Sequence, residues 1–393
     1  KNEVNNQRVA SVGTCSVMGT ASTMACIAEA LGMTVPGGAS PPAVTADRIR
    51  VAEETGRRAV QMAHDRLTID QILTADAFEN AMRVLLAIGG STNGIVHLTA
   101  IAGRVGLEID LNALDQMGNE TPVLLDLKPS GQHYMEHFHD AGGMATLLRE
   151  LKPLLKLNAM TVTGRTLGEE IDAAGPGFVQ DVVRPFSKPI YPRGSIAILY
   201  GNLAPGGAVI KQSAADERLM EHIGRAIVFE NTEDLVNRID SEDLDVNADD
   251  ILVLKQIGPK GAPGMPEAGY MPIPKKLARA GVKDMVRISD GRMSGTAFGT
   301  IVLHITPESA IGGPLAYVEE GDQIQLSVKN RQISLLISDD ELAKRMQARP
   351  ISPPTAERGY HKLFLDTVTQ ADQGVDFDFL RAVNMTGKTP RSK

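Results

Sequence analysis

Residues 251–305 have the sequence ILVLKQIGPKGAPGMPEAGYMPIPKKLARAGVKDMVRISDGRMSGTAFGTIVLHI. Three short apolar runs lie within it, at 251–255, 285–288 and 300–305, and turns rich in Gly and Pro separate them. Short runs of β-branched residues between such turns are typical of buried strands. We interpret residues 274–280 as a helix between two of these strands. This part of the chain is therefore predicted to alternate strands with helices.

The same pattern extends outward from this stretch. Toward the N-terminus it predicts strands at 196–200, 208–210 and 226–230, with a helix at 233–239. Toward the C-terminus, residues 324–337 alternate like a hairpin around Lys329-Asn330-Arg331. Strands interleaved with helices predict α/β structure of open-barrel or layered character.

Before about residue 160 the pattern changes to helices. They are predicted at 22–31, 44–58, 78–88, 94–102, 134–140 and 144–155. The predicted fold class is α/β: a largely helical α/β N-terminal part followed by a C-terminal β/α/β barrel-like (swivelling) domain. We expect the domains to span 1–160 and 161–393, with the boundary falling somewhere within 155–190.

Composition limits the partners that the protein can have. The chain has 393 residues, 42% hydrophobic and 22% charged, which is the balance of a soluble globular protein. A net charge of -8 argues against nucleic acid or an anionic membrane as the main partner, because either requires a basic surface. There is no apolar run of membrane-spanning length. Two cysteines make no disulfide framework, so a reducing cytoplasm is expected.

Cys15 lies in a loop of small residues, GTCSVMGT at 13–20, that leads into a predicted helix. A thiolate there would be favoured by the positive end of the helix and by nearby backbone N–H groups. Such a position suits a metal ligand or a nucleophile, or simply a small buried hydrophobic residue. Cys26 lies inside the helix, where core packing is the favoured role. Two cysteines do not make a cluster site, which needs three or four ligands.

Two loops that follow predicted strands also carry candidate residues. The Gly- and Pro-rich loop at 258–267 ends on Glu267, which fits either a ligand of a hard cation such as Mg²⁺ or a solvated carboxylate. The loop at 289–296, SDGRMSGT, carries Ser294 and Thr296 beside an arginine. It suits an anionic, hydroxylated ligand, or a polar turn that caps a helix.

Other motifs point less clearly to chemistry. The turn GGSTN at 89–93 contains Ser91, a possible cap for the helix that carries His97. His133, His137 and His139 include the i, i+4 spacing of a helical metal pair, but no acidic residue stands where a zinc protease motif needs one. Neither a dinucleotide-binding fingerprint nor a phosphate-binding loop is present.

The order of these motifs is more specific than any one of them. The run CSVMGTASTMACIAEALGM at 15–33 strongly resembles the dihydroxy-acid dehydratase/6-phosphogluconate dehydratase family. So do the GGSTN turn with His97-Leu98, the turn PSG at 129–131, the loop GNLAP at 201–205, and the loops that carry Glu267 and Ser294. The motifs occur in the family's order over nearly the whole chain. The tail, with ERGY at 357–360, resembles the pentonate (sugar-acid) branch of the family.

The resemblance implies a dehydratase that converts a 2,3-dihydroxy sugar acid into a 2-keto-3-deoxy acid. It implies an iron–sulfur cluster, 2Fe-2S rather than 4Fe-4S, as the Lewis acid for the leaving hydroxyl, and Mg²⁺ at the substrate carboxylate. By the same resemblance Cys15 would be a cluster ligand, Glu267 a Mg²⁺ ligand and Ser294 the base. Thr296 would lie beside Ser294 against the substrate. The resemblance also implies a homodimer or homotetramer.

The family has a further N-terminal portion with two more cluster cysteines, acidic Mg²⁺ ligands and a metal-binding lysine, which this sequence does not match. We therefore expect the chain as it stands to complete neither metal site, to be free of the cluster or poorly occupied by it, and to be inactive. A branched-chain dihydroxy-acid dehydratase and a non-catalytic scaffold are the alternative functions.

Overall fold

The structure is a computed structural model that describes residues 13, 15–268 and 270–382. Contacts divide the chain into two compact units, each with two segments of sequence. The first unit comprises Lys1–Gly94 and Gln116–Ser195, and the second comprises Ile95–Asp115 and Ile196–Lys393. The predicted domains, 1–160 and 161–393, stay a prediction.

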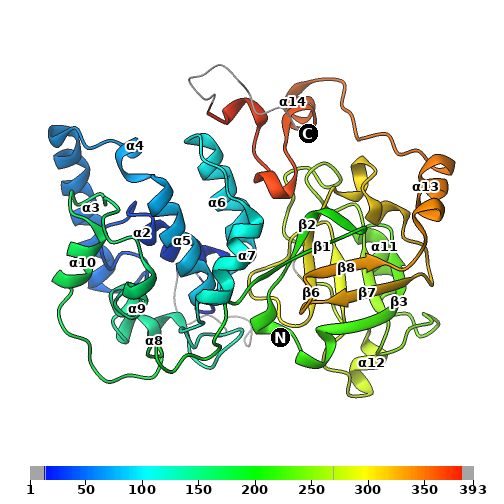
Figure 1. The fold of residues 1–393 in the computed structure, drawn as a ribbon, viewed down its shortest axis with the longest axis horizontal. Helices are drawn as coiled ribbons and strands as arrows, with labels where there is room; N and C mark the ends of the chain where they lie inside the picture. The colour runs from blue at the N-terminus through cyan, green and yellow to red at the C-terminus, as the bar shows by residue number, and fades with distance from the viewer. Residues whose placement is uncertain (1–12, 14, 269, 383–393) are drawn as a thin grey trace. The chain divides into compact units, whose positions relative to one another are not determined.

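The first unit is built from helices (Figure 1). They are α2 (Thr20–Ala30), α3 (Ala46–Asp65), α4 (Ile69–Ile72), α5 (Ala75–Ala87), α8 (Met135–Asp140), α9 (Gly143–Leu151), the 3₁₀ helix η1 (Lys152–Leu154) and α10 (Leu167–Ala173). The division between the units falls within two further helices, α6 (Asn93–Arg104) and α7 (Leu111–Glu120). In the turn before α6, Ser91 Oγ accepts the Asn93 N–H at 3.2 Å, so this hydroxyl satisfies one of the donors at the start of the helix.

The second unit contains the strands. Among the described residues these are β1 (Ala197–Gly201), β2 (Ala204–Ile210), β3 (Glu221–Phe229), β4 (Ile251–Leu254), β5 (Arg287–Ser289), β6 (Ile301–Thr306), β7 (Gln323–Ser327) and β8 (Gln332–Leu335). The helices are α11 (Thr232–Arg238), α12 (Lys275–Arg279), α13 (Asp339–Ala348), α14 (Gly359–Thr367) and the 3₁₀ helices η2 (Gln212–Ala214), η3 (Glu217–Leu219), η4 (Ser309–Ile311), η5 (Pro314–Tyr317), η6 (Ala371–Gln373) and η7 (Asp378–Leu380). No described helix combines the length and apolar character needed to cross a bilayer.

The strands close into a barrel in the order β1-β2-β6-β5-β4-β3-β7-β8 (Figure 1). β3, β4, β5 and β6 are mutually parallel, whereas β1–β2, β2–β6, β3–β7 and β7–β8 are antiparallel. A parallel bridge from Tyr200 to Gln332 joins β8 to β1. The predicted hairpin is confirmed as β7 and β8.

The barrel has one apolar cluster inside and another on its outer face. Alternate strand residues such as Val253, Ile288 and Val302 form the inner cluster. Their neighbours, including Leu252 and Leu254, pack outward in a second cluster with Leu235 of α11. β4 is buried on both faces, which is why its sequence is continuously apolar.

The predicted fold class is wrong. In place of a helical N-terminal part and a separate barrel-like domain, the structure has a closed barrel of mixed strand direction and a helical segment, Ile95–Asp115, that belongs to the barrel unit. The physical reason lies in long-range contacts that local periodicity cannot reveal. Arg331 Nε donates to Asp115 Oδ2 at 2.7 Å, and Arg104 forms a two-point ion pair with Asp376 at 2.7 and 2.8 Å.

Candidate functional site

The loops that follow β4 and β5 bring Glu267 and Arg292 together. The two residues form a parallel bridge, and the Ala268 N–H donates to the Arg292 carbonyl at 3.0 Å. Arg292 Nη1 lies 3.7 Å from Glu267 Oε1, and their side chains are 21% and 33% exposed. The Arg292 Nε also donates to the Met265 carbonyl, which holds the guanidinium in place. A carboxylate and a guanidinium that both remain accessible can take part in binding an anionic or hydroxylated ligand.

Ser294 and Thr296 meet in the same loop. The Ser294 Oγ lies 2.9 Å from the Thr296 Oγ1, and it accepts the Thr296 N–H at 3.3 Å. The Thr296 N–H therefore donates to the Ser294 oxygen, and the Thr296 hydroxyl, which can be donor or acceptor in this contact, is placed to be a second donor. Such donors stabilise negative charge on that oxygen more than they stabilise the neutral hydroxyl. The geometry favours Ser294 as a group that can lose its proton.

His97 of α6 belongs to the same electrostatic environment. Burial lowers the pKa of this histidine, the Arg292 guanidinium lowers it further, and Glu267 partly opposes both effects. A neutral imidazole therefore stands near the pair formed by Glu267 and Arg292.

His304 lies on β6 at a β-bulge. On β2 the step from Gly207 to Val209 covers two residues, but the partners on β6, Thr306 and Leu303, are three residues apart. β6 thus has one extra residue at this point. His304 adopts φ = +58° there, which interrupts the regular alternation of side chains along the strand. Its ring is buried, and its Nε2 has no hydrogen-bond partner among the described residues. Burial is the main cause that lowers the pKa of His304 to about 3, and electrostatic repulsion by Arg292 and His97 acts in the same direction.

The Asp290 carboxylate forms hydrogen bonds that connect three loops at the ends of strands. It accepts the Ser309 N–H at 2.8 Å, the Ser309 hydroxyl at 2.5 Å and the Ile257 N–H at 3.2 Å. Burial raises the pKa of Asp290 to about 6, although these three donors oppose the shift. Asp290 therefore anchors the start of the loop that carries Ser294.

Cys15 is in the first unit, whereas Ser294 and Glu267 are in the second. Its thiol is free and the residue is exposed, and its carbonyl accepts the Ser22 hydroxyl at 3.4 Å. Thr14, beside it in the predicted loop, lies outside the described residues. Cys26 is fully buried in α2, and burial raises the pKa of its thiol far above the usual range. Exposure leaves the Cys15 sulfur accessible to a ligand, whereas Cys26 is part of the core.

The residues that the structure describes do not by themselves fit an iron–sulfur cluster or a Mg²⁺ site. No group of three or more His, Cys, Asp or Glu side chains is placed to hold a metal ion within the described ranges. Cys15 and Glu267 can each offer one donor, whereas clusters and hard cations need several.

The predicted histidine set in the first unit is dispersed. The rings of His133 and His137 lie 5.6 Å apart, edge to face, whereas His139 turns away and places its Nε2 3.2 Å from Asp47 Oδ2. His133 and His137 line an open pocket of about 290 Å³ together with Asp140.

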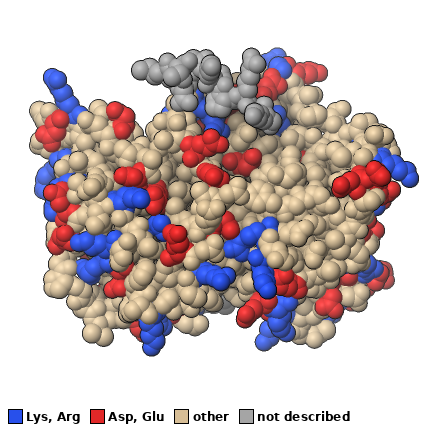
Figure 2. All heavy atoms as spheres, viewed as in Figure 1, with Lys and Arg blue, Asp and Glu red and all other residues tan. Residues whose placement is uncertain are grey.

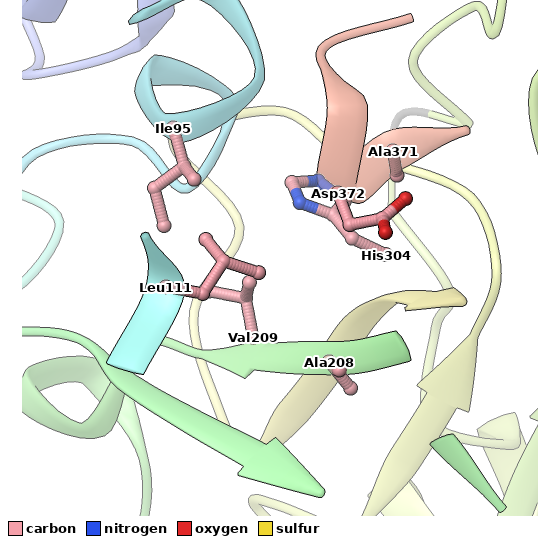
Figure 3. A pocket seen from close by; sticks show the side chains of 8 residues that line it. Ile95, Leu111, Ala208, Val209, His304, Ala371 and Asp372 are labelled. Atoms are coloured by element: carbon pink, nitrogen blue, oxygen red, sulfur yellow. The ribbon is translucent and has the colours of Figure 1, made fainter. Parts of the chain in front are cut away.

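Sequence analysis did not single out His304 or Asp372 as site residues. Both line a small cavity in the second unit (Figure 3), and both bury a polar atom without a partner among the described residues. The only sequence signal at His304 is an imidazole inside an otherwise apolar strand. Asp372 lies in a polar tail segment that carries no signal of burial.

Comparison with known proteins identifies the family. The chain matches the model for the dihydroxy-acid/6-phosphogluconate dehydratase N-terminal region over residues 1–170 and the model for the C-terminal region over residues 181–375. It is 49% identical over 365 residues to an L-arabonate dehydratase of Azospirillum brasilense, covering 91% of this chain and 62% of that protein.

Two further relatives support the same grouping. An L-arabinonate dehydratase of Rhizobium leguminosarum bv. trifolii is 48% identical, covering 96% of this chain and 66% of its own length. A 6-deoxy-6-sulfo-D-gluconate dehydratase of Pseudomonas putida is 43% identical, covering 99% of this chain and 67% of its own length. The chain thus spans less than two thirds of the length of the Azospirillum and Rhizobium proteins. On these matches, the chain belongs to the dihydroxy-acid/6-phosphogluconate dehydratase family.

Proposed function

We propose that the protein is a hydro-lyase that removes water from a 2,3-dihydroxy sugar acid and yields a 2-keto-3-deoxy acid. The observation that carries this proposal is the Ser294–Thr296 pair, in which the Thr296 N–H donates to the Ser294 oxygen and the two hydroxyls lie within hydrogen-bond distance. The names of relatives such as L-arabonate dehydratase and L-arabinonate dehydratase support the class of substrate.

In the proposed reaction Ser294, as an alkoxide, takes the proton from C2. The electrons of the C2–H bond form a C2–C3 double bond, and the C3–O bond breaks. The leaving hydroxide takes the proton that Ser294 removed from C2, which gives water and restores the alkoxide. The enol that remains tautomerises to the 2-keto acid by losing the proton on its C2 oxygen and gaining one at C3. Thr296 acts by donating to the Ser294 oxygen, which lowers the free energy of its charged form.

The remaining residues of the site bind and orient the substrate in this proposal. The Arg292 guanidinium is the group that fits the charged or hydroxylated end of an acid, and Glu267 restrains it from one side at 3.7 Å. The neutral His97 beside them can accept or donate a hydrogen bond without adding charge.

Iron–sulfur and Mg²⁺ remain proposed cofactors, the cluster being 2Fe-2S rather than 4Fe-4S. Bound together, they would supply a Lewis acid for the leaving hydroxyl and a positive charge for the substrate carboxylate. Cys15 would be one ligand of the cluster and Glu267 one ligand of Mg²⁺, each among several.

The proposed partner is a small sugar acid, with no nucleic acid and no membrane. The mixing of acidic and basic side chains over the visible face in Figure 2 supports a small-molecule partner rather than a polyanion, as does the net charge of -8. A homodimer or homotetramer in the cytoplasm completes the proposal, and light scattering on the purified protein would determine the assembly.

The second candidate function is the dehydration of a branched-chain dihydroxy acid. A relative named dihydroxy-acid dehydratase, from Caldicellulosiruptor bescii, is 40% identical over 366 residues, which is less than the identity to the sugar-acid enzymes. A panel that compares pentonates with 2,3-dihydroxyisovalerate separates the two candidates.

The test is a 2-keto acid assay on the protein at its natural length, purified without oxygen, with iron and sulfide analysis of the same sample. We expect keto acid from a pentonate, and Ser294→Ala should lower the rate by about 10²- to 10⁴-fold, the usual contribution of a positioned base. Keto acid from 2,3-dihydroxyisovalerate alone would favour the second candidate. A protein that is inert on every 2,3-dihydroxy acid would favour a non-catalytic scaffold.

A further inference from the structure

A small cavity in the second unit has two unlike walls. Figure 3 shows Ile95 of α6, Leu111 of α7 and Val209 of β2 on one side, and the His304 ring with Asp372 of η6 on the other. Its volume of about 10 Å³ is the space of one water molecule or one hydroxyl group. The cavity is thus apolar except at two side chains.

Those two side chains each present an unsatisfied atom. The His304 Nε2 and the Asp372 Oδ1 are buried and have no hydrogen-bond partner among the described residues. Leaving such atoms without partners destabilises the folded protein. A hydroxyl group carries one donor and two acceptor positions, so it offers the kinds of partner that these two atoms lack.

The backbone conformation of His304 on β6 is strained. The bulge on β6 requires a left-handed conformation at a residue that is not glycine, with φ = +58°. An apolar residue following the regular alternation would have packed into the barrel instead. In this strained conformation the imidazole of His304 lines the cavity.

The cavity is close to the loop that carries Ser294. The His304 N–H donates to the Gly291 carbonyl at 3.1 Å. Gly291 and Ser294 are three residues apart, so their Cα atoms lie at most roughly 10 Å from each other. His304 is thus joined through its backbone to the loop that carries Ser294, and its ring is near enough to Arg292 of that loop for the guanidinium to lower its pKa.

The charges fit a neutral polar group better than an ion. Burial, with Arg292 and His97, keeps His304 neutral by lowering its pKa to about 3. Burial also raises the pKa of Asp372. A bound anion would meet the Asp372 carboxyl, and a bound cation would lose its hydration in an apolar pocket, so a hydroxyl is the better occupant.

We propose that this cavity is the subsite for a hydroxyl group on the distal carbons of the substrate, held by His304 Nε2 and Asp372 Oδ1. This inference rests on the proposed function, and it names the feature that selects polyhydroxylated acids over alkyl ones. A site built to bond a hydroxyl discriminates strongly against an analogue that lacks it, because the buried polar groups then remain unpaired.

The test compares a pentonate with its 5-deoxy and 4-deoxy analogues in the natural-length enzyme and in Asp372→Leu, which has nearly the same shape but no acceptor. In the wild type, one deoxy analogue should lose about 10- to 100-fold in kcat/KM, the worth of one hydrogen bond to a charged group. In Asp372→Leu that difference should shrink to about threefold or less. Asp372→Asn keeps an acceptor and should restore part of the discrimination.

The matched control is Ser213→Ala, which removes another buried hydroxyl of the second unit that has no partner among the described residues and does not line the cavity. It should leave the discrimination unchanged. Thermal unfolding of every variant checks that the fold survives. Equal losses on the pentonate and both deoxy analogues in Asp372→Leu would overturn the subsite and leave the cavity to a structural water. Absence of keto acid from wild-type enzyme with every 2,3-dihydroxy acid would instead refute the proposed function itself.

Discussion

The oxygen of Ser294 makes hydrogen bonds with the N–H and the hydroxyl of one residue, Thr296, and this makes the pair testable by single substitutions. The pair is local, since the two residues are separated by one glycine in the sequence. Their proximity could therefore be predicted from the motif. The proximity of His304 and Asp372 to one cavity could not be predicted, because the two residues are 68 positions apart in the sequence and neither has a local pattern of its own.

Thr296→Val should lower kcat for the sugar acid by about 10-fold, because it removes one hydrogen bond of about 1.4 kcal/mol from the charged form of Ser294. Thr296→Ser keeps the hydroxyl and is the matched control, with a rate close to that of the wild type. Initial rates of 2-keto acid formation measure both. Equal rates for Thr296→Val and Thr296→Ser would show that the threonine hydroxyl has no part in the reaction.

Lys211 offers a second prediction at this scale. Its Nζ is buried without a partner among the described residues, and burial lowers its pKa from 10.5 to about 8. The charged amine therefore destabilises the folded protein by about 3 kcal/mol below pH 8, and this penalty fades as the pH rises toward 10.5. Lys211→Met should accordingly be more stable than the wild type at neutral pH.

The gain from Lys211→Met should decrease between pH 8 and pH 10.5, as the wild-type amine loses its proton in both states. Midpoints of urea unfolding across this range measure it. Lys329→Met, at an exposed position in the turn after β7, is the control and should change little. A stability gain that does not depend on pH would mean that burial does not shift the pKa of the Lys211 amine.

At the scale of the element, the strand-end loops are held by one carboxylate. Asp290 receives donors from the loop after β4 and from η4 after β6, while it starts the loop after β5. Short apolar runs identify individual strands because each run is contiguous in the sequence. The barrel order cannot be obtained in that way, since β2 pairs with β6 and β3 with β7 across long stretches of chain.

Asp290→Asn should lower the free energy of unfolding by about 1–3 kcal/mol. Two donors meet Asp290 Oδ2 and one meets Oδ1, so the amide nitrogen of asparagine must face at least one N–H group. Chemical denaturation at pH 7 measures the loss. Asp249→Asn, at an exposed position before β4, is the control and should cost little. A wild-type midpoint for Asp290→Asn would mean that the three hydrogen bonds are not made in solution.

The pH dependence of this carboxyl has a defined sign. Its folded pKa of about 6 lies above the ordinary value of 3.8, so the folded state prefers the protonated form. The wild type should therefore lose stability as the pH rises from about 4 to 6, whereas Asp290→Asn lacks that component.

At the scale of the whole molecule, two compact units share one chain that passes from the first to the second, back and forward again. Each unit has its own buried contacts. In the first, Arg83 of α5 donates to Thr121 Oγ1 at 3.1 Å and pairs with Glu120 at 3.2 Å. The assignment of Ile95–Asp115 to the barrel unit could not be predicted from helical periodicity, which is the same whichever unit a helix joins.

We expect calorimetry to resolve two unfolding transitions, since proteins with more than one unit depart from two-state behaviour. Arg83→Met should lower one transition, and Asp290→Asn should lower the other. A single transition that both variants shift equally would mean that the two units unfold as one cooperative body.

The shared chain also sets an order of events during synthesis. Both segments of the first unit lie before residue 196, so they can fold together while the barrel strands are still being made. The segment Ile95–Asp115 must wait, because its partners Arg331 and Asp376 emerge from the ribosome more than 200 residues later. Until then its apolar helix face is open to chaperones and to misassembly, and slow translation before the barrel would lengthen that exposure.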